Sequence, residues 1–103
     1  MRKFVFLHYG FEPPTPEIMA AWGKWFEAMK DHIADIGGHF SHGRAISHAG
    51  VEELPLGPDS ITGFTIVRAE SIDHAERMAR TNPYISSIRV YELMTPQPRE
   101  PNQ

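Results

Sequence analysis

Cysteine is missing from the 103-residue sequence, and its absence excludes disulfides, thiolate metal sites and a cysteine nucleophile. It also fits a reducing compartment, so we expect a cytoplasmic protein. Long apolar runs are missing too, because no stretch approaches the roughly 18 residues of a membrane-spanning helix. The apolar stretch after Arg2 and Lys3 is short and has no small-residue cleavage site, which favours a strand over a signal peptide.

A strong excess of one sign of charge is also missing. The net charge is −3 with neutral histidines, and the scattered cations argue against a nucleic-acid surface. Hydrophobic residues make up 41% and charged residues 22% of the chain, as in ordinary globular domains. We predict a single domain at residues 1–95, followed by a disordered, proline-rich tail at residues 96–103. So small a domain buries only about two-thirds of its unfolded surface, and a partner subunit would add to that burial.

Apolar alternation predicts the strands. Residues 3–9 and 62–69 carry apolar side chains on both faces, and a strand of this kind is covered on both sides. A last strand is expected at residues 87–94. Residues 39–48 are rich in His, Ser and Gly and form a weak strand at best. Residues 50–60 are expected to be a long connection.

Two helices are expected between these strands. The first begins at Thr15, an N-cap residue, and a proline follows in the first turn. Apolar residues then recur every three or four positions as far as Ile36, which predicts an amphipathic helix ended by the glycines at positions 37 and 38. A shorter helix is capped by Ser71 and stops before Pro83.

The order β-α-β-β-α-β predicts an α+β fold of ferredoxin-like topology. Its four-stranded antiparallel sheet has strand order 4-1-3-2, with two helices on one face. The first and third strands are then central, in agreement with their apolar character on both faces. The face without helices would expose an apolar patch that soluble monomers rarely tolerate. We therefore predict a homodimer packed sheet to sheet, a dimeric α/β barrel; the alternative is that long loops cover this face.

Several segments, in their order and spacing over roughly residues 3–94, carry a resemblance to a known family. They are Phe4-Val5-Phe6-Leu7-His8-Tyr9-Gly10-Phe11, Ile36-Gly37-Gly38, Thr62-Gly63-Phe64-Thr65-Ile66-Val67, Ala69-Glu70-Ser71-Ile72-Asp73-His74-Ala75 and Asn82-Pro83-Tyr84. In these segments the chain resembles the YCII-related family. The resemblance implies a dimeric α/β barrel with cavities between sheet and helices or near the dimer seam. Some relatives are thought to use a His–Asp pair, and one branch removes chloride from a chlorinated hydroxyquinol.

The sequence departs from the family in its first helix. Where those relatives place a histidine, this chain has Trp22, Trp25 and Phe26. Asp35 lies about where some relatives have an acid at the end of the first helix. Asp35 is therefore the one catalytic candidate that the resemblance carries over.

The predicted topology sorts the polar candidates into two ends of the sheet. His8 lies at the upper end, with Trp22, His48 and Glu92. The lower end collects the remaining candidates, which are Asp35, His39 and Arg68. His8 and Glu92 lie on adjacent strands and could form a His–carboxylate pair that abstracts a proton from a phenol or an acidic carbon. The alternative is a structural histidine and a surface acid.

The aromatic and basic candidates have two interpretations each. Trp22 and Trp25 lie on the apolar stripe, where aromatic side chains belong to a core; they could instead form a flat wall for a ring-shaped ligand. Arg68 could anchor a carboxylate or be a solvated surface residue. His39 and His42 point to opposite faces of a strand, and no local pattern matches a closed zinc site. We predict neither a metal nor an organic cofactor.

Two functions follow from these candidates. The first is a cofactor-free enzyme that acts on a small aromatic or acidic metabolite by proton transfer between histidine and carboxylate. The alternative is a non-catalytic dimeric module that binds a small molecule or a protein. The distinguishing feature is whether a histidine and an acid converge on a cavity.

Overall fold

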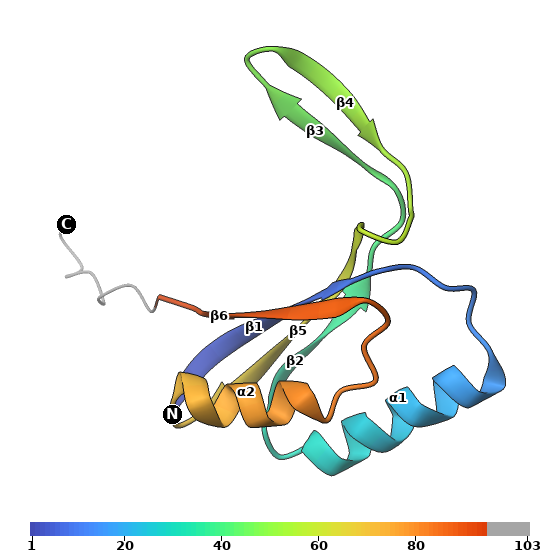
Figure 1. Ribbon diagram of the computed structural model, residues 1–103. Coiled ribbons are helices and arrows are strands. Elements are labelled where there is room, and N and C mark those ends of the chain that lie inside the picture. The colour runs from blue at the N-terminus through green and yellow to red at the C-terminus, as the bar shows by residue number, and fades with distance from the viewer. Residues whose placement is uncertain (95–103) are drawn as a thin grey trace, which may run out of the picture.

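The computed structural model describes residues 1–94, so the tail predicted at residues 96–103 lies outside the described residues. Six strands and two helices make up this part of the chain (Figure 1). The elements are β1 (Arg2–Tyr9), α1 (Pro16–Met29), β2 (Ile33–His39), β3 (Gly43–Ser47), β4 (Gly50–Leu54), β5 (Ile61–Ala69), α2 (Ile72–Arg80) and β6 (Ser87–Glu92). Neither of the helices within residues 1–94 is long and apolar enough to cross a membrane.

Four strands form the main sheet, in the order β2-β5-β1-β6, and every neighbouring pair is antiparallel. The strands with apolar side chains on both faces, β1 and β5, occupy the centre, as the sequence predicts. Both helices lie on one face of this sheet (Figure 1). The predicted α+β class, with two helices and an antiparallel sheet, is confirmed.

The first helix begins where the sequence predicts and ends earlier. The Thr15 side chain accepts a hydrogen bond from the Ile18 backbone N–H at 3.1 Å. The helix stops at Met29, and the isoleucines at positions 33 and 36 belong to strand β2. Gly37 has φ +75° and lies so close to the Phe64 carbonyl oxygen that any Cβ would collide with it. The glycine thus permits an irregularity in the edge strand β2 and does not terminate the helix.

A second two-stranded sheet replaces the predicted weak strand and long connection. β3 and β4 pair with each other as a hairpin, which we call the arm (residues 43–54). Ile46 lies opposite Val51, and Arg44 forms a 2.9 Å ion pair with Glu53 on the facing strand. The arm was missed because its apolar and polar side chains do not alternate strictly along either strand.

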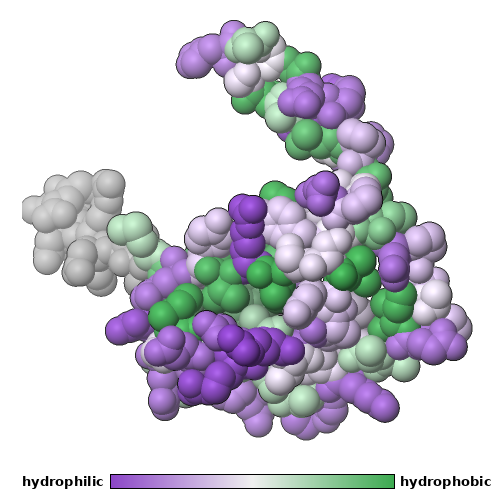
Figure 2. Space-filling view, viewed as in Figure 1, coloured by the Kyte–Doolittle hydropathy of each residue, from purple (hydrophilic) through white to green (hydrophobic). Residues whose placement is uncertain are grey.

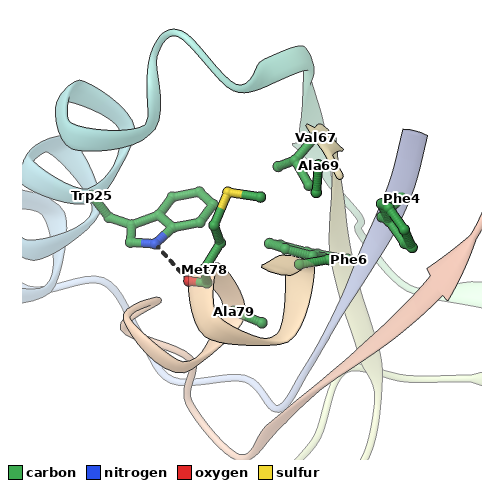
Figure 3. Packing of buried hydrophobic residues seen from close by; sticks show 8 residues of the cluster. Phe4, Phe6, Trp25, Val67, Ala69, Met78 and Ala79 are labelled. Carbon is green, nitrogen blue, oxygen red and sulfur yellow. Dashed lines mark hydrogen bonds between the residues drawn. The ribbon is translucent and has the colours of Figure 1, made fainter. Parts of the chain in front are cut away.

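The core lies between the main sheet and the helices (Figure 3). Its buried side chains are Phe4, Phe6, Val67 and Ala69 from the sheet, Trp25 from α1, and Ala75, Met78 and Ala79 from α2. The Trp25 indole N–H donates to the Thr81 hydroxyl at 3.0 Å and lies 3.4 Å from the Met78 carbonyl oxygen. Trp25 is therefore a core residue that connects the two helices, and it forms no wall of an open pocket.

Candidate functional site

His8 is a buried polar residue on the helix-covered face of β1, with 9% of its surface exposed. Its Nε2 lies 3.1 Å from the Thr65 hydroxyl, which in turn donates to the Ile36 carbonyl at 3.5 Å. A hydroxyl that donates its own proton accepts one from the imidazole, so this chain of contacts favours the Nε2–H tautomer. Nδ1 is then an acceptor, and it is buried without a hydrogen-bond partner among the described residues.

The surroundings of His8 keep its imidazole neutral. Burial, with a smaller contribution from the nearby His39, lowers the pKa of His8 from 6.5 to about 4. His8 and His39 both lie opposite Gly63, one on each side of β5. His39 is thus at the same end of the sheet as His8. Its predicted place at the lower end is wrong, because α1 ends early and β2 runs upward to finish at His39.

Trp22 from α1 packs against His8, as the predicted topology has it. The two rings are perpendicular, with centroids 5.0 Å apart. Trp22 also contacts the rings of Trp25 and Phe26, at 6.2 and 5.7 Å. The half-buried Trp22 thus forms one side of an aromatic cluster that covers the imidazole and separates it from solvent.

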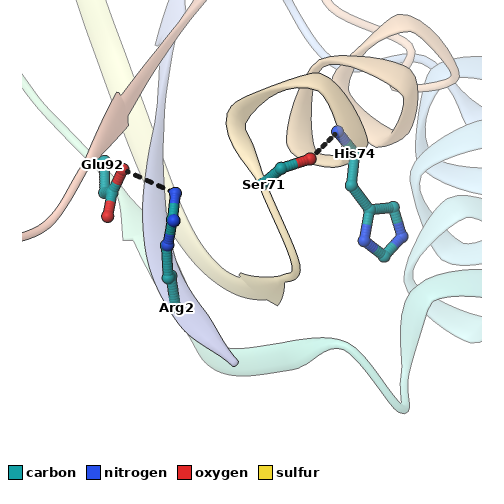
Figure 4. Close-up of polar contacts among 4 residues, drawn as sticks. All are labelled: Arg2, Ser71, His74 and Glu92. Atoms are coloured by element: carbon teal, nitrogen blue, oxygen red, sulfur yellow. Dashed lines mark hydrogen bonds and ion pairs between the residues drawn. The ribbon is translucent and has the colours of Figure 1, made fainter.

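The predicted pair of His8 with Glu92 does not form. Glu92 lies opposite Phe4 in the register of β1 and β6, whereas Ile88 lies opposite His8. Glu92 instead forms a 3.5 Å ion pair with Arg2 at the lower end of the sheet (Figure 4). The two strands are antiparallel, so the end of β6 meets the start of β1, where Arg2 is and His8 is not.

The other predicted site residues are dispersed. Asp35 lies within β2, not at a helix end, and its carboxylate accepts a hydrogen bond from the Gly37 backbone N–H at 2.8 Å. Arg68 is exposed and donates to the Ile33 carbonyl at 3.3 Å. His48 lies in the turn of the arm, outside the main sheet and away from His8. The predicted lower cluster therefore does not assemble.

Figure 4 also shows the start of the second helix, where the Ser71 hydroxyl accepts a hydrogen bond from the His74 backbone N–H at 3.1 Å. This is the N-cap that the sequence predicts. The His74 ring lies 5.5 Å from the ring of His32. Among residues 1–94, however, no group of three or more His, Asp or Glu side chains is placed to hold a metal ion.

A hollow at the base of the arm has a volume of about 1010 Å³. Rings line it from several sides: Tyr9, His39, Phe40 and His42. The Arg89 guanidinium lies 4.7 Å from the centre of the Tyr9 ring, and such a contact holds the ring in place. Phe40 stacks on Phe64 at 5.9 Å.

Sequence reasoning missed this hollow because it depends on the arm. The remaining lining residues are Ser41, Gly43, Arg44, Glu52, Glu53, Leu54, Pro55, Leu56, Gly57, Pro58, Asp59, Ser60 and Ile61. Most of them lie in the segments expected to be a weak strand and a connection. Neither side of the turn at His48 alternates strictly, so the spacing of apolar residues gave no clear signal for a hairpin.

The sheet has a second, helix-free surface, which we call the open face. Its apolar and aromatic side chains, half-buried except for the exposed Tyr91, are Val5, Leu7, Tyr9, Phe64, Ile66 and Tyr91. The cations Lys3, Arg68 and Arg89 share this face. Lys3 lies directly opposite Arg68 across β1 and β5. The open face is thus an apolar area with a basic border.

In comparisons with known proteins, the chain matches no family model and no curated protein sequence. The function therefore has to be argued from the site itself.

Proposed function

We propose that this chain is a homodimeric small-molecule binding module, with the ligand site in the hollow at the base of the arm. In this proposal two copies pack sheet to sheet through their open faces, in the ferredoxin-like, dimeric α/β barrel arrangement of the YCII-related family. The observation that carries it is the open face, an apolar surface on central strands for which residues 1–94 provide no covering helix.

The composition of the open face supports a second copy as its cover. Val5, Leu7 and Ile66 are aliphatic and lie on the two central strands, where side chains pack most closely against a facing sheet. Contiguous apolar surfaces of this kind on soluble proteins mark interaction sites. Two copies related by a two-fold axis cover both open faces at once with a single contact.

The surroundings of His8 favour binding over catalysis. A general base works best with a pKa near the operating pH and within hydrogen-bond reach of its substrate. The pKa of His8 is lowered to about 4 by burial, its Nε2 is engaged by Thr65, and Trp22 covers it. Glu92 lies opposite Phe4, too far from His8 to raise the pKa of its imidazole. Proton transfer by a His–carboxylate pair therefore has no support at this position.

The lining of the hollow indicates the class of ligand. Tyr9 and Phe40 offer aromatic faces, and His39 and His42 offer imidazoles that can hydrogen-bond an acidic group. A small aromatic acid or phenol matches both features. The volume of the hollow is at the upper end of the roughly 300–1,000 Å³ usual for small-molecule pockets. A partner subunit across the mouth of the hollow would reduce that volume.

Sedimentation equilibrium tests the dimer. The wild-type chain should sediment at twice its monomer mass of 11.7 kDa at micromolar concentration. Ile66→Lys places a charge in the open face and should give monomers. Met19→Lys makes the same kind of change at a side chain on α1 that is 65% exposed and should leave the dimer intact. A wild-type chain found only at 11.7 kDa would refute the proposal.

A thermal-shift screen of aromatic acids and phenols tests the ligand class. At least one compound should raise the melting temperature of the wild-type protein and lose that effect in His42→Ala. His48→Ala, in the turn of the arm, is the matched control and should keep the effect. A screen without any shift would contradict the ligand class while leaving the dimer untouched.

A further inference from the structure

The arm stands clear of the rest of the described chain (Figures 1 and 2). β3 and β4 hydrogen-bond as strands only with each other among the strands of residues 1–94. Every residue of β4 is exposed, and in β3 only Ala45 is half-buried. An isolated two-stranded hairpin is at best marginally stable in water. The arm therefore needs a surface to pack against.

One face of the arm carries an apolar pair. Residues directly opposite in an antiparallel ladder share a face, so Ile46 lies beside Val51. Their side chains are 80% and 63% exposed. The neighbouring pair on this face, Arg44 and Glu53, neutralises itself through its 2.9 Å ion pair. The apolar pair is thus not surrounded by unpaired charge, which suits it to burial in a contact.

We propose that each arm of the dimer docks on the second copy through Ile46 and Val51, at the border of that copy's open face. This inference rests on the proposed dimer. Figure 1 shows the arm on the helix-free side of the sheet, curving back over it. A second copy packed on the open face therefore occupies the space into which the arm extends. The two-fold symmetry of such a dimer makes both arms dock in the same way.

The net charges of the arm and of the open face have opposite signs. The arm has two acids and one cation, and since Arg44 pairs with Glu53, the net charge of the arm is that of Glu52, which lies beside Ala45 on the face opposite Ile46 and Val51. The open face has the three cations Lys3, Arg68 and Arg89 and, within its register, the single acid Asp35. An acidic arm that approaches a basic border meets a favourable field. Contact between two arms would instead bring like charges together.

Arm docking also bears on the ligand site. Residues 52–54 of the arm and the segment that returns to β5 form one wall of the hollow. Once the arm is fixed on the second copy, that wall is fixed as well. The hollow is then complete only in the dimer, and its shape depends on contacts made at the far end of the arm.

The first test measures the dimer dissociation constant of the double variant Ile46→Thr/Val51→Thr. Threonine keeps the β-branching that suits a strand, so the hairpin is retained and only apolar contact is lost. The two arms of the dimer lose four apolar side chains in all. We therefore expect the dimer dissociation constant to rise at least roughly 100-fold. Ala45→Thr/Ser47→Thr, on the opposite face of the arm, is the matched control and should change the constant by less than about threefold.

The second test uses trypsin, because Arg44 is the only cleavage site for this protease within the arm. Cleavage after Arg44, followed by mass spectrometry, should be slow in the wild-type dimer and at least roughly tenfold faster in the Ile66→Lys monomer, where the arm is undocked. Cleavage after Lys24, on the exposed side of α1, reports whether the two proteins are equally folded and should occur at the same rate in both.

The outcomes separate this inference from the proposed dimer. A monomeric wild-type chain refutes both. A wild-type dimer whose dissociation constant is unchanged by the double threonine variant, with Arg44 cut rapidly in both dimer and monomer, refutes arm docking and leaves the sheet-to-sheet dimer standing. Slow cleavage after Arg44 in both dimer and monomer would mean that the arm packs on its own sheet, which also refutes docking on the second copy.

Discussion

Replacement of Trp25 by alanine measures how strongly the helices are held on the sheet. The indole is 4% exposed, and its ring centroid lies 6.2 Å from that of Phe6 on β1 and 5.3 Å from that of Phe26 on α1. Removal of a buried tryptophan costs about 3–5 kcal/mol, since it combines lost burial with a cavity. A small domain has a total stability of about 5–15 kcal/mol, so Trp25→Ala should remove a large part of it.

A phenylalanine at the same position separates ring packing from hydrogen bonding. The Trp25 indole N–H donates to the Thr81 hydroxyl at 3.0 Å, and that hydroxyl donates to the Met78 carbonyl at 2.7 Å. Thr81 therefore keeps a partner when the indole N–H is lost. Trp25→Phe retains an aromatic ring and should cost about 1–2 kcal/mol, well below the alanine variant.

Urea denaturation followed by circular dichroism is the assay, at one fixed protein concentration because the unfolding of a dimer depends on concentration. Met19→Ala, at a 65% exposed position of α1, is the control and should change stability by less than about 0.5 kcal/mol. A midpoint that Trp25→Ala leaves unchanged would refute the packing argument, because it would mean that the indole is not buried in solution.

Further predictions concern three single residues. His8 should titrate by NMR near pH 4, below its usual value of 6.5, and Glu92→Gln should not move it; a pKa above 6.5 would contradict the described burial. As the pH falls, His8 is protonated in the unfolded chain before it is protonated in the folded one. The contribution of His8 to the free energy of unfolding should therefore be fully present above about pH 6.5 and fall by on the order of 3 kcal/mol towards pH 4, as urea midpoints measured across this range would show. Gly37→Ala should cost about 1–3 kcal/mol in thermal unfolding, since the positive φ of Gly37 and a nearby carbonyl exclude a Cβ. The control Gly38→Ala has open space around it and should cost less than about 1 kcal/mol. Equal costs of the two variants would contradict the argument. Thr15→Ala should cost about 1 kcal/mol by loss of the N-cap, and Thr15→Ser should restore it; no difference between the two would show that the cap is unimportant.

Local sequence signals determined the starts of both helices and the central strands of the sheet. Thr15 and the proline after it set the start of α1, because a side-chain acceptor and a fixed φ act within one turn. Ser71 acts in the same way for α2. The apolar alternation of β1 and β5 predicted their central positions, because a strand with apolar side chains on both faces must be covered on both.

Tertiary contacts decided the segment between α1 and β5. Ile33 and Ile36 continue the helical spacing of three and four, and spacing alone cannot distinguish that stripe from an edge strand. Pairing with β5, together with the close approach of Gly37 to the Phe64 carbonyl, selected the strand. With β2 placed there, the polar residues that follow were free to fold into the arm.

The candidate site divides along the same line. The contact of His8 with Trp22 was predicted, because it requires only that the helix after β1 returns across its upper end. The separation of His8 from Glu92 depends on strand register, and the position of His39 across β5 from His8 depends on where α1 ends. A register shift of a few residues changes neither composition nor periodicity, so the sequence by itself determined which strands are central and the tertiary structure decided which polar side chains meet.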